Sequence, residues 1–171
     1  AKAHGCLVSF DVNYRRLLWP VGEEPAPHIL TAANMADIVK FSREELEALF
    51  GEGVDFPDGL QPATGRLVVV SDGANPLQVY SPARMFTLRP PSVEAKDTTA
   101  AGDSFVAGLL YRLGDQADDS RAFDHWLRQP DKLEEALVFA SRCGAYTAMH
   151  YGAFEALPTL GPLQRLVPET I

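Results

Sequence analysis

Short apolar runs alternate along the chain with segments whose apolar residues recur every three or four positions. Residues 6–10, 36–41 and 66–71 are short and mostly apolar, so each predicts a buried strand. Residues 77–81 and 85–88 alternate between apolar and polar positions, which predicts an antiparallel hairpin. Helical spacing predicts helices over residues 28–34, 43–50, about 103–113 and 133–147, and short helices at 123–127 and after Pro158.

This order of strands and helices predicts a single α/β domain. We expect a three-layer α/β/α arrangement around a mostly parallel sheet with the hairpin at one edge. The chain has 171 residues, of which 46% are hydrophobic, and that is enough for one substantial core. Ligands of open parallel sheets bind beyond the carboxyl ends of the strands, so polar residues that directly follow a strand are candidates for function.

The run Asp97–Phe105 combines polar residues, three small residues and an acid at the start of a helix. Ala100, Ala101 and Gly102 carry little side chain, so a ligand can approach their backbone N–H groups closely. The first turn of a helix has unpaired N–H groups and the positive end of a dipole, which together favour an anion. Asp103 beside such a site suits the removal of a proton from an attacking hydroxyl. The structural alternative is that Asp103 only caps the helix.

This run resembles the second signature of the ribokinase-like (PfkB) carbohydrate kinases, Asp-Thr-x-Gly-Ala-Gly-Asp-x-Phe. Ala100 stands where Gly is usual, and Ala restricts the positive φ angles that Gly adopts readily. The resemblance implies ATP-dependent phosphorylation of a sugar hydroxyl, with Asp103 as the base and the amides of Ala100, Ala101, Gly102 and Asp103 holding the transferred phosphoryl group. It covers nearly all of residues 1–171 but only the C-terminal part of the family's domain, so we expect a ribokinase-like fold that is incomplete at its N-terminal side.

Polar residues alternate directly after the first predicted strand. Asp11, Asn13 and Arg15 would point the same way in an extended loop, and Arg15 could bind phosphate or sugar oxygens with two N–H groups. A solvated loop held by an Asp–Arg pair explains the same residues. The string is similar to the Asp-x-Asn-x-Arg segment of fructokinases and 2-keto-3-deoxygluconate kinases, which implies that Asn13 and Arg15 bind the substrate.

Ser42 and Glu45 form a capping-box pattern at the start of a predicted helix. That pattern alone accounts for both residues. The segment is similar to the family's Asn-x-x-Glu motif, whose Glu orders Mg²⁺ and phosphate through water, with Ser42 in place of Asn. The resemblance therefore implies a second role for Glu45 in metal and cofactor binding.

Further site residues are implied by the resemblance. Ser71 ends the third predicted strand and Gly73 lies in the turn after it, where the family lines the nucleotide. Ala140 and Gly144 lie on the helix that flanks the adenine in the family, although small residues on a helical stripe are also typical of core packing. The oxygens of Asp97 and Thr99 could hold a monovalent cation such as K⁺, and turn-stabilising hydrogen bonds are the structural alternative.

Composition limits the partners. The net charge is −8 and basic runs are short, which argues against nucleic acid. The two cysteines give no disulfide framework, the histidines lack zinc-ligand spacing, and no apolar run approaches the length of a membrane span. We therefore expect a cytoplasmic protein. The resemblance implies ATP and a sugar as partners, together with Mg²⁺, and K⁺ is left open. A homodimer is also left open.

The sequence favours a fructokinase, with a 2-keto-3-deoxygluconate kinase as the alternative substrate class. A different class of function stays open. Residues 1–171 by themselves could be a nucleotide-binding fragment or a non-catalytic sugar-sensing module, because the resemblance covers only part of the family's domain.

Overall fold

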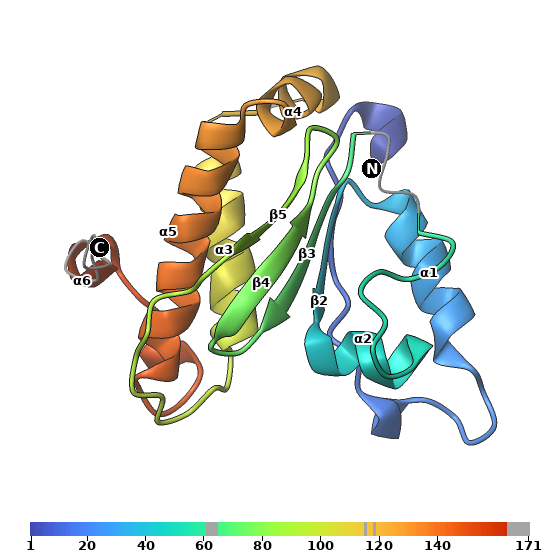
Figure 1. Ribbon diagram of the computed structural model, residues 1–171, viewed down its shortest axis with the longest axis horizontal. Helices are drawn as coiled ribbons and strands as arrows, with labels where there is room; N and C mark the ends of the chain where they lie inside the picture. The colour runs from blue at the N-terminus through green and yellow to red at the C-terminus, as the bar shows by residue number, and fades with distance from the viewer. Residues whose placement is uncertain (61–64, 115, 118, 164–171) are drawn as a thin grey trace.

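The computed structural model describes residues 1–60, 65–114, 116–117 and 119–163. Its centre is a five-stranded sheet in which the strands lie in chain order (Figure 1). The first three strands pair in parallel, and the last two continue the sheet as an antiparallel meander. The strands are β1 (Ser9–Asp11), β2 (Ile38–Ser42), β3 (Leu67–Asp72), β4 (Asn75–Tyr80) and β5 (Met85–Leu88).

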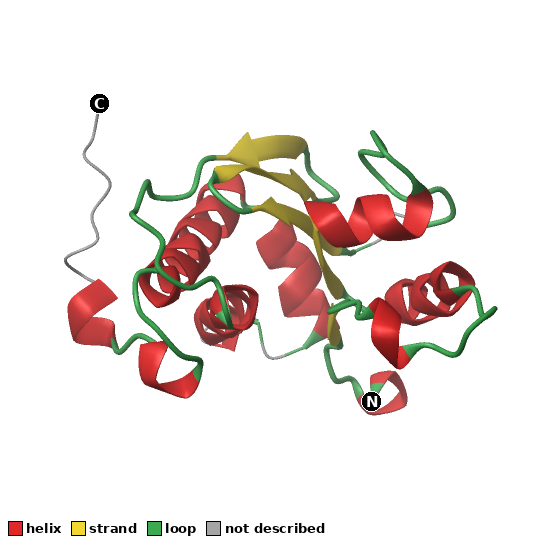
Figure 2. Cartoon of the chain, turned by 90° about the horizontal axis from the view of Figure 1, so that it is seen from below, coloured by secondary structure: helices red, strands yellow, loops and turns green. Residues whose placement is uncertain are grey.

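Helices cover both faces of the sheet. The helices α1 and α2 lie on one face and α3 and α5 on the other, which gives three layers (Figures 1 and 2). The α-helices are α1 (Pro25–Met35), α2 (Arg43–Phe50), α3 (Ala101–Gly114), α4 (Ser120–Leu127), α5 (Pro130–Ala148) and α6 (Leu160–Leu163). Short 3₁₀ helices are η1 (Lys2–His4), η2 (Arg16–Leu18) and η3 (Phe154–Ala156).

The two faces of the sheet bury two separate hydrophobic clusters. In β2, Ile38 belongs to the cluster beneath α3 and α5, whereas Val39 and Phe41 belong to the cluster beneath α1 and α2. Successive side chains of a strand point to opposite faces, so Lys40 lies on the same face as Ile38. A lysine thus occupies this face of β2 two residues before the strand ends at Ser42.

The predicted three-layer α/β/α fold is confirmed, with two adjustments to the sheet. It is more mixed than expected, because β4 pairs antiparallel with β3 as well as with β5. The turn at Gly73 and Ala74, with a positive φ of 54° at Gly73, makes this pairing with β3 a tight hairpin. The predicted strand at residues 6–10 is instead the short, partly exposed strand β1, because it is the edge strand of the described sheet.

The helix predictions hold, with changes at the ends. The helix expected near Asp103 begins two residues earlier, at Ala101, and the helix expected at 28–34 begins at Pro25. Helix α4 lies in a stretch expected at the surface, yet its Phe123 and Trp126 are buried against α5 and the sheet.

The predicted capping box at the start of α2 is present. The Glu45 amide donates to Ser42 Oγ at 3.2 Å, and the Ser42 amide donates to Glu45 Oε2 at 2.7 Å. Both bonds satisfy N–H groups that have no acceptor within the helix. They also fix the Glu45 carboxylate at the end of β2.

We expect Ser42→Ala to lower the free energy of unfolding by about 1 kcal/mol, because it removes the acceptor for the Glu45 amide. Ser42→Asn, which keeps an acceptor, should lose less. Urea denaturation measures both, with Ser92→Ala in an exposed loop as the control. Equal loss for Ser42→Ala and the control would contradict the cap.

Candidate active site

A cavity of about 740 Å³ opens at the carboxyl ends of β1, β2 and β3. The starts of α2 and α3 lie at this edge of the sheet, at the bottom of Figure 1. The volume is typical of a site for a small molecule or cofactor. Its lining combines residues from the loop after β1, the end of β2, the β3–β4 turn, the start of α3 and the last half of α5, among them Asn13, Arg15, Glu45, Ser71, Gly73, Ala100, Ala101, Gly102, Asp103 and Gly144.

The turn before α3 forms one wall of the cavity. The Ala101 amide donates to the Thr98 carbonyl at 3.1 Å, so this amide is used within the turn. The amides of Gly102 and Asp103 belong to the first helical turn, whose N–H groups have no intrahelical acceptor. The positive end of the helix dipole adds to them. The arrangement suits an anion bound at Gly102 and Asp103.

Ala100 adopts the left-handed conformation, with φ at 61°. This is the position at which the signature has Gly, and a Cβ there crowds the neighbouring carbonyl at a cost of about 1–2 kcal/mol. The turn therefore keeps a left-handed residue at position 100, although Ala stands there in place of the Gly of the signature.

We expect Ala100→Gly to raise the free energy of unfolding by up to about 1 kcal/mol, because relief of strain exceeds the added entropy of the unfolded chain. The matched control is Ala107→Gly on the exposed side of α3, which should lower it by about 1 kcal/mol. Chemical denaturation gives both values. The same sign for the two variants would show that Ala100 carries no strain.

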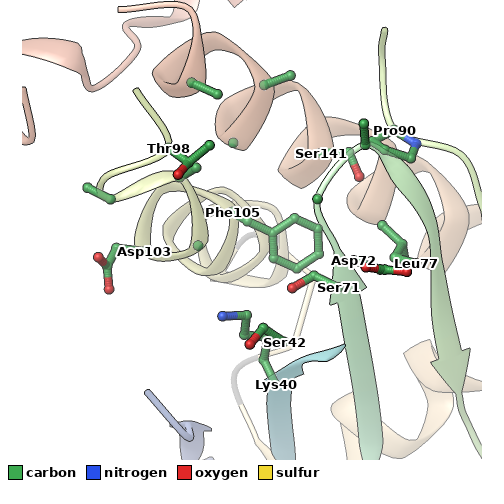
Figure 3. A pocket seen from close by; sticks show the side chains of 18 of the residues that line it. Lys40, Ser42, Ser71, Asp72, Leu77, Pro90, Thr98, Asp103, Phe105 and Ser141 are labelled. Carbon is green, nitrogen blue, oxygen red and sulfur yellow. The ribbon is translucent and has the colours of Figure 1, made fainter. Parts of the chain in front are cut away.

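Asp103 lies in the first turn of α3, exposed and at the lining of the cavity. Figure 3 shows its carboxylate beside the start of this helix, on the side toward which the Lys40 ammonium points. A carboxylate in this place can reach a hydroxyl group brought into the cavity. It is not the residue that precedes the helix, so the capping alternative does not describe its position.

The loop after β1 enters the cavity but is not extended. Asp11, Asn13 and Arg15 all line the cavity, yet Asn13 is left-handed, with φ at 45°, and Val12 is buried. The Arg15 guanidinium lies 3.9 Å from Glu45 Oε1 and donates to the Tyr14 carbonyl at 3.0 Å. Its side chain is 61% exposed, so the guanidinium keeps free donors for a ligand.

Glu45 is buried and ties two segments together. Its Oε1 accepts from the Tyr14 amide at 2.8 Å, and its Oε2 accepts from the Ser42 amide. Each carboxylate oxygen has a second lone pair, so Glu45 can still bind water. Its place at the cavity lining therefore fits Mg²⁺ held through water rather than by direct coordination. No group of three or more metal-ligating side chains occurs within residues 1–60, 65–114, 116–117 and 119–163.

The residues expected at the nucleotide divide into two groups. Ser71, Gly73 and Gly144 line the cavity. Ala140 does not, because it is fully buried where α5 packs on α3, and a Cβ added at Gly108 would lie 3.1 Å from its Cα. At Ala140 the small side chain serves helix packing, which was the structural alternative.

Asp97 and Thr99 lie just before the turn at residues 100–102, the candidate anion site, which is called the anion turn below. Asp97 Oδ1 accepts from the Thr99 amide at 2.9 Å, and Oδ2 accepts from the Gly152 amide at 3.1 Å. The Thr99 side chain, then the Thr99 amide and the Gly152 amide hold the pKa of the Asp97 carboxyl below its ordinary value. Thr99 lines the cavity, and the hydrogen bonds are those of the turn-stabilising alternative. The carboxylate still has lone pairs for a cation.

A carboxyl group with a lowered pKa stabilises the fold only while it is ionised, so its contribution is lost as the pH falls through the folded-state pKa. We therefore expect wild type to be more stable than Asp97→Asn at neutral pH, by a margin that shrinks below about pH 4. Denaturation curves at several pH values measure the margin. A margin independent of pH would contradict the assignment.

Several residues of the cavity were not assigned to the site from the sequence patterns. Lys40, Phe105 and Ser141 all line it (Figure 3). The sequence signal for Lys40 was a charged residue inside an otherwise apolar strand. Ser141 Oγ is buried without a recorded hydrogen-bond partner among the described residues. Ser141 lies four residues after Leu137, so the two share a face of α5.

No helix in the described part of the chain is both long and apolar enough to cross a membrane. The fold and the cavity define a three-layer α/β/α protein in which the start of α3 lines a cavity at the carboxyl edge of the sheet. The model of the pfkB family carbohydrate kinases matches residues 1–160. The chain belongs to this family.

Known proteins similar to this chain include fructokinases. Fructokinase-1 of Oryza sativa subsp. japonica is 42% identical over 93% of this chain and 48% of its own length. The fructokinase of Xylella fastidiosa with bound ATP superimposes with a TM-score of 0.87 at 35% identity, over 96% of this chain and 52% of that one. The fructokinase of Vibrio cholerae O395 with fructose, ADP and a calcium ion gives 0.80 at 37% identity, over the same shares of the two chains. The chain thus spans about half the length of the relatives it matches.

Proposed function

We propose that this chain carries the nucleotide-binding and catalytic part of an ATP-dependent sugar kinase of the fructokinase type. The observation that carries the proposal is the convergence of Asp103 and the amides of the α3 start on one cavity with Arg15 and Gly73. A general base beside preorganised backbone donors is what phosphoryl transfer to a hydroxyl requires. Family membership supports the same function.

In this mechanism Asp103 accepts the proton of a sugar hydroxyl while the oxygen of that hydroxyl forms a bond to the γ-phosphorus of ATP. The bond from that phosphorus to the β,γ-bridging oxygen breaks, and its electron pair leaves with ADP. The amides of Gly102 and Asp103 hold charge that builds on the transferred phosphoryl group, and Ala100 and Ala101 shape the turn. The products are a sugar phosphate, ADP and a proton on Asp103.

The remaining residues bind and orient. Arg15 and Asn13 contact the sugar or its phosphate, and Ser71, Gly73 and Gly144 contact the nucleotide. Glu45 would hold Mg²⁺ through water, and the metal would supply positive charge to the nucleotide phosphates. Asp97, whose Oδ2 accepts from the Gly152 amide, and Thr99 are the candidate oxygen ligands for K⁺.

Fructose is the proposed acceptor, because the similar proteins named above are fructokinases. 2-Keto-3-deoxygluconate is the alternative from the Asp-x-Asn-x-Arg string. Coupled ADP-release assays with both compounds separate them. A kcat/KM for fructose at least tenfold above that for 2-keto-3-deoxygluconate supports the proposal, and the reverse order favours the alternative.

We expect Asp103→Asn to abolish phosphoryl transfer and to leave the affinity for ADP within about threefold, because Asn cannot accept the proton but keeps the shape of the turn. The assay uses the longest native polypeptide that contains residues 1–171. Asp131→Asn at the start of α5 is the control. Turnover of Asp103→Asn within tenfold of wild type would rule out Asp103 as the base.

Calorimetry on residues 1–171 tests the fragment hypothesis. Binding of ADP without binding of fructose indicates that the sugar site needs further chain. Binding of both, without turnover, favours a sensing module.

A further inference from the structure

Lys40 is a buried cation within the sheet. Lys40 is only 8% exposed and lies in β2 between Val39 and Phe41, which are fully buried. The ammonium lies 3.2 Å from Asp11 Oδ1, and Asp11 is its direct neighbour in the parallel pairing of β1 and β2. Lysine is rarely this buried unless its charge is paired, and Asp11 supplies that pair.

The ammonium also lies against the start of α3. A Cβ added at Gly102 would be 3.0 Å from Lys40 Nζ, so the missing side chain of Gly102 leaves the space that the ammonium occupies. Figure 3 shows Lys40 extending toward this helix start. An anion held by the Gly102 amide would therefore lie within reach of Nζ.

The contact brings two positive centres together. The amino end of a helix carries about half a positive charge, which disfavours an adjacent cation. Asp11 supplies one negative charge beside these two positive centres. Burial raises the pKa of its carboxyl above the ordinary value, although Lys40 lowers it. Of the other nearby carboxylates, Glu45 accepts two backbone amides, and Asp103 is exposed, so solvent screens its charge. An anion at the α3 start would satisfy both positive centres.

We propose that Lys40 is a catalytic residue whose ammonium contacts a non-bridging oxygen of the γ-phosphoryl group, while Asp11 is a positioning residue that holds the ammonium in place. The proposal rests on the proposed kinase function and adds a cation to its anion site. Lys40 stabilises the negative charge of the phosphoryl group during transfer and exchanges no proton in the reaction.

A structural role for the pair makes a different prediction. If Lys40 and Asp11 only stabilise β1, replacing both with neutral residues should change stability without distinguishing between nucleotides. Neutral replacement of a buried ion pair is often tolerated, whereas removal of one partner leaves an unpaired buried charge. The double variant Lys40→Met/Asp11→Asn therefore tests the role of the charge with the smallest risk of unfolding.

The test compares ADP with the non-hydrolysable ATP analogue AMP-PNP by calorimetry, on the longest native polypeptide that contains residues 1–171. We expect the double variant to bind AMP-PNP at least tenfold more weakly than wild type and ADP within threefold, because only AMP-PNP presents the γ-phosphoryl group. Its kcat should fall about 100-fold, as for loss of one transition-state donor. Lys132→Met, on the exposed side of α5, is the matched control and should change none of these values.

Equal losses for the two nucleotides, or no loss, would overturn the proposal for Lys40. The single variant Lys40→Met gives a second comparison if the double variant unfolds in thermal denaturation. If wild type phosphorylates sugar and Asp103→Asn does not, unchanged affinities and kcat in the double variant refute the role of Lys40 and leave the kinase proposal standing. If wild type binds nucleotide but transfers no phosphoryl group, the kinase proposal fails and the ADP and AMP-PNP affinities still decide on Lys40. A wild type that binds neither nucleotide overturns both.

Discussion

The close contact between α3 and α5 is the constraint on which the candidate site depends. A Cβ at Gly108 would lie 2.7 Å from Cys143 Sγ, and a Cβ at Gly144 would lie 3.0 Å from the Ala101 carbonyl oxygen. Neither position has room for a larger side chain, because the clashing atoms belong to the backbone or to a buried residue. The two glycines therefore set how near the helices lie, and the one at 144 sets the distance from α5 to the first residue of α3. The anion turn takes its position from this packing.

The opposite wall of the cavity depends on one carboxylate. Glu45 accepts the Ser42 amide as part of the helix cap and the Tyr14 amide from the loop after β1. The Glu45 side chain thus connects the end of β2 and the start of α2 to the loop that follows the neighbouring strand β1. Because Glu45 is buried, these hydrogen bonds are weakly screened by solvent. The position of Arg15 follows from that of Tyr14, so the predicted substrate loop and the predicted metal residue form one structural unit.

Local patterns in the sequence predicted most of the fold and part of the site. Continuous β-branched residues identified β3, and the capping box at Ser42 identified the start of α2 to the residue. The short run at residues 6–10 did not reveal an edge strand, because burial depends on neighbours in space. The resemblance of the 97–105 run supplied the anion turn and Asp103, but it could not distinguish Gly144, which lines the cavity, from Ala140, which is buried in the core.

The sequence by itself determined where strands and helices form, which caps and turns bound them, and which family signature the chain carries, because each depends on residues within a few positions of one another. Only the tertiary structure decided which residues meet. Lys40 and Gly102 are far apart in the chain, and their contact depends on the place of β2 in the sheet and on the packing of α3 against the sheet. Contacts of this kind are set by the backbone paths of several elements at once, and no local pattern encodes them.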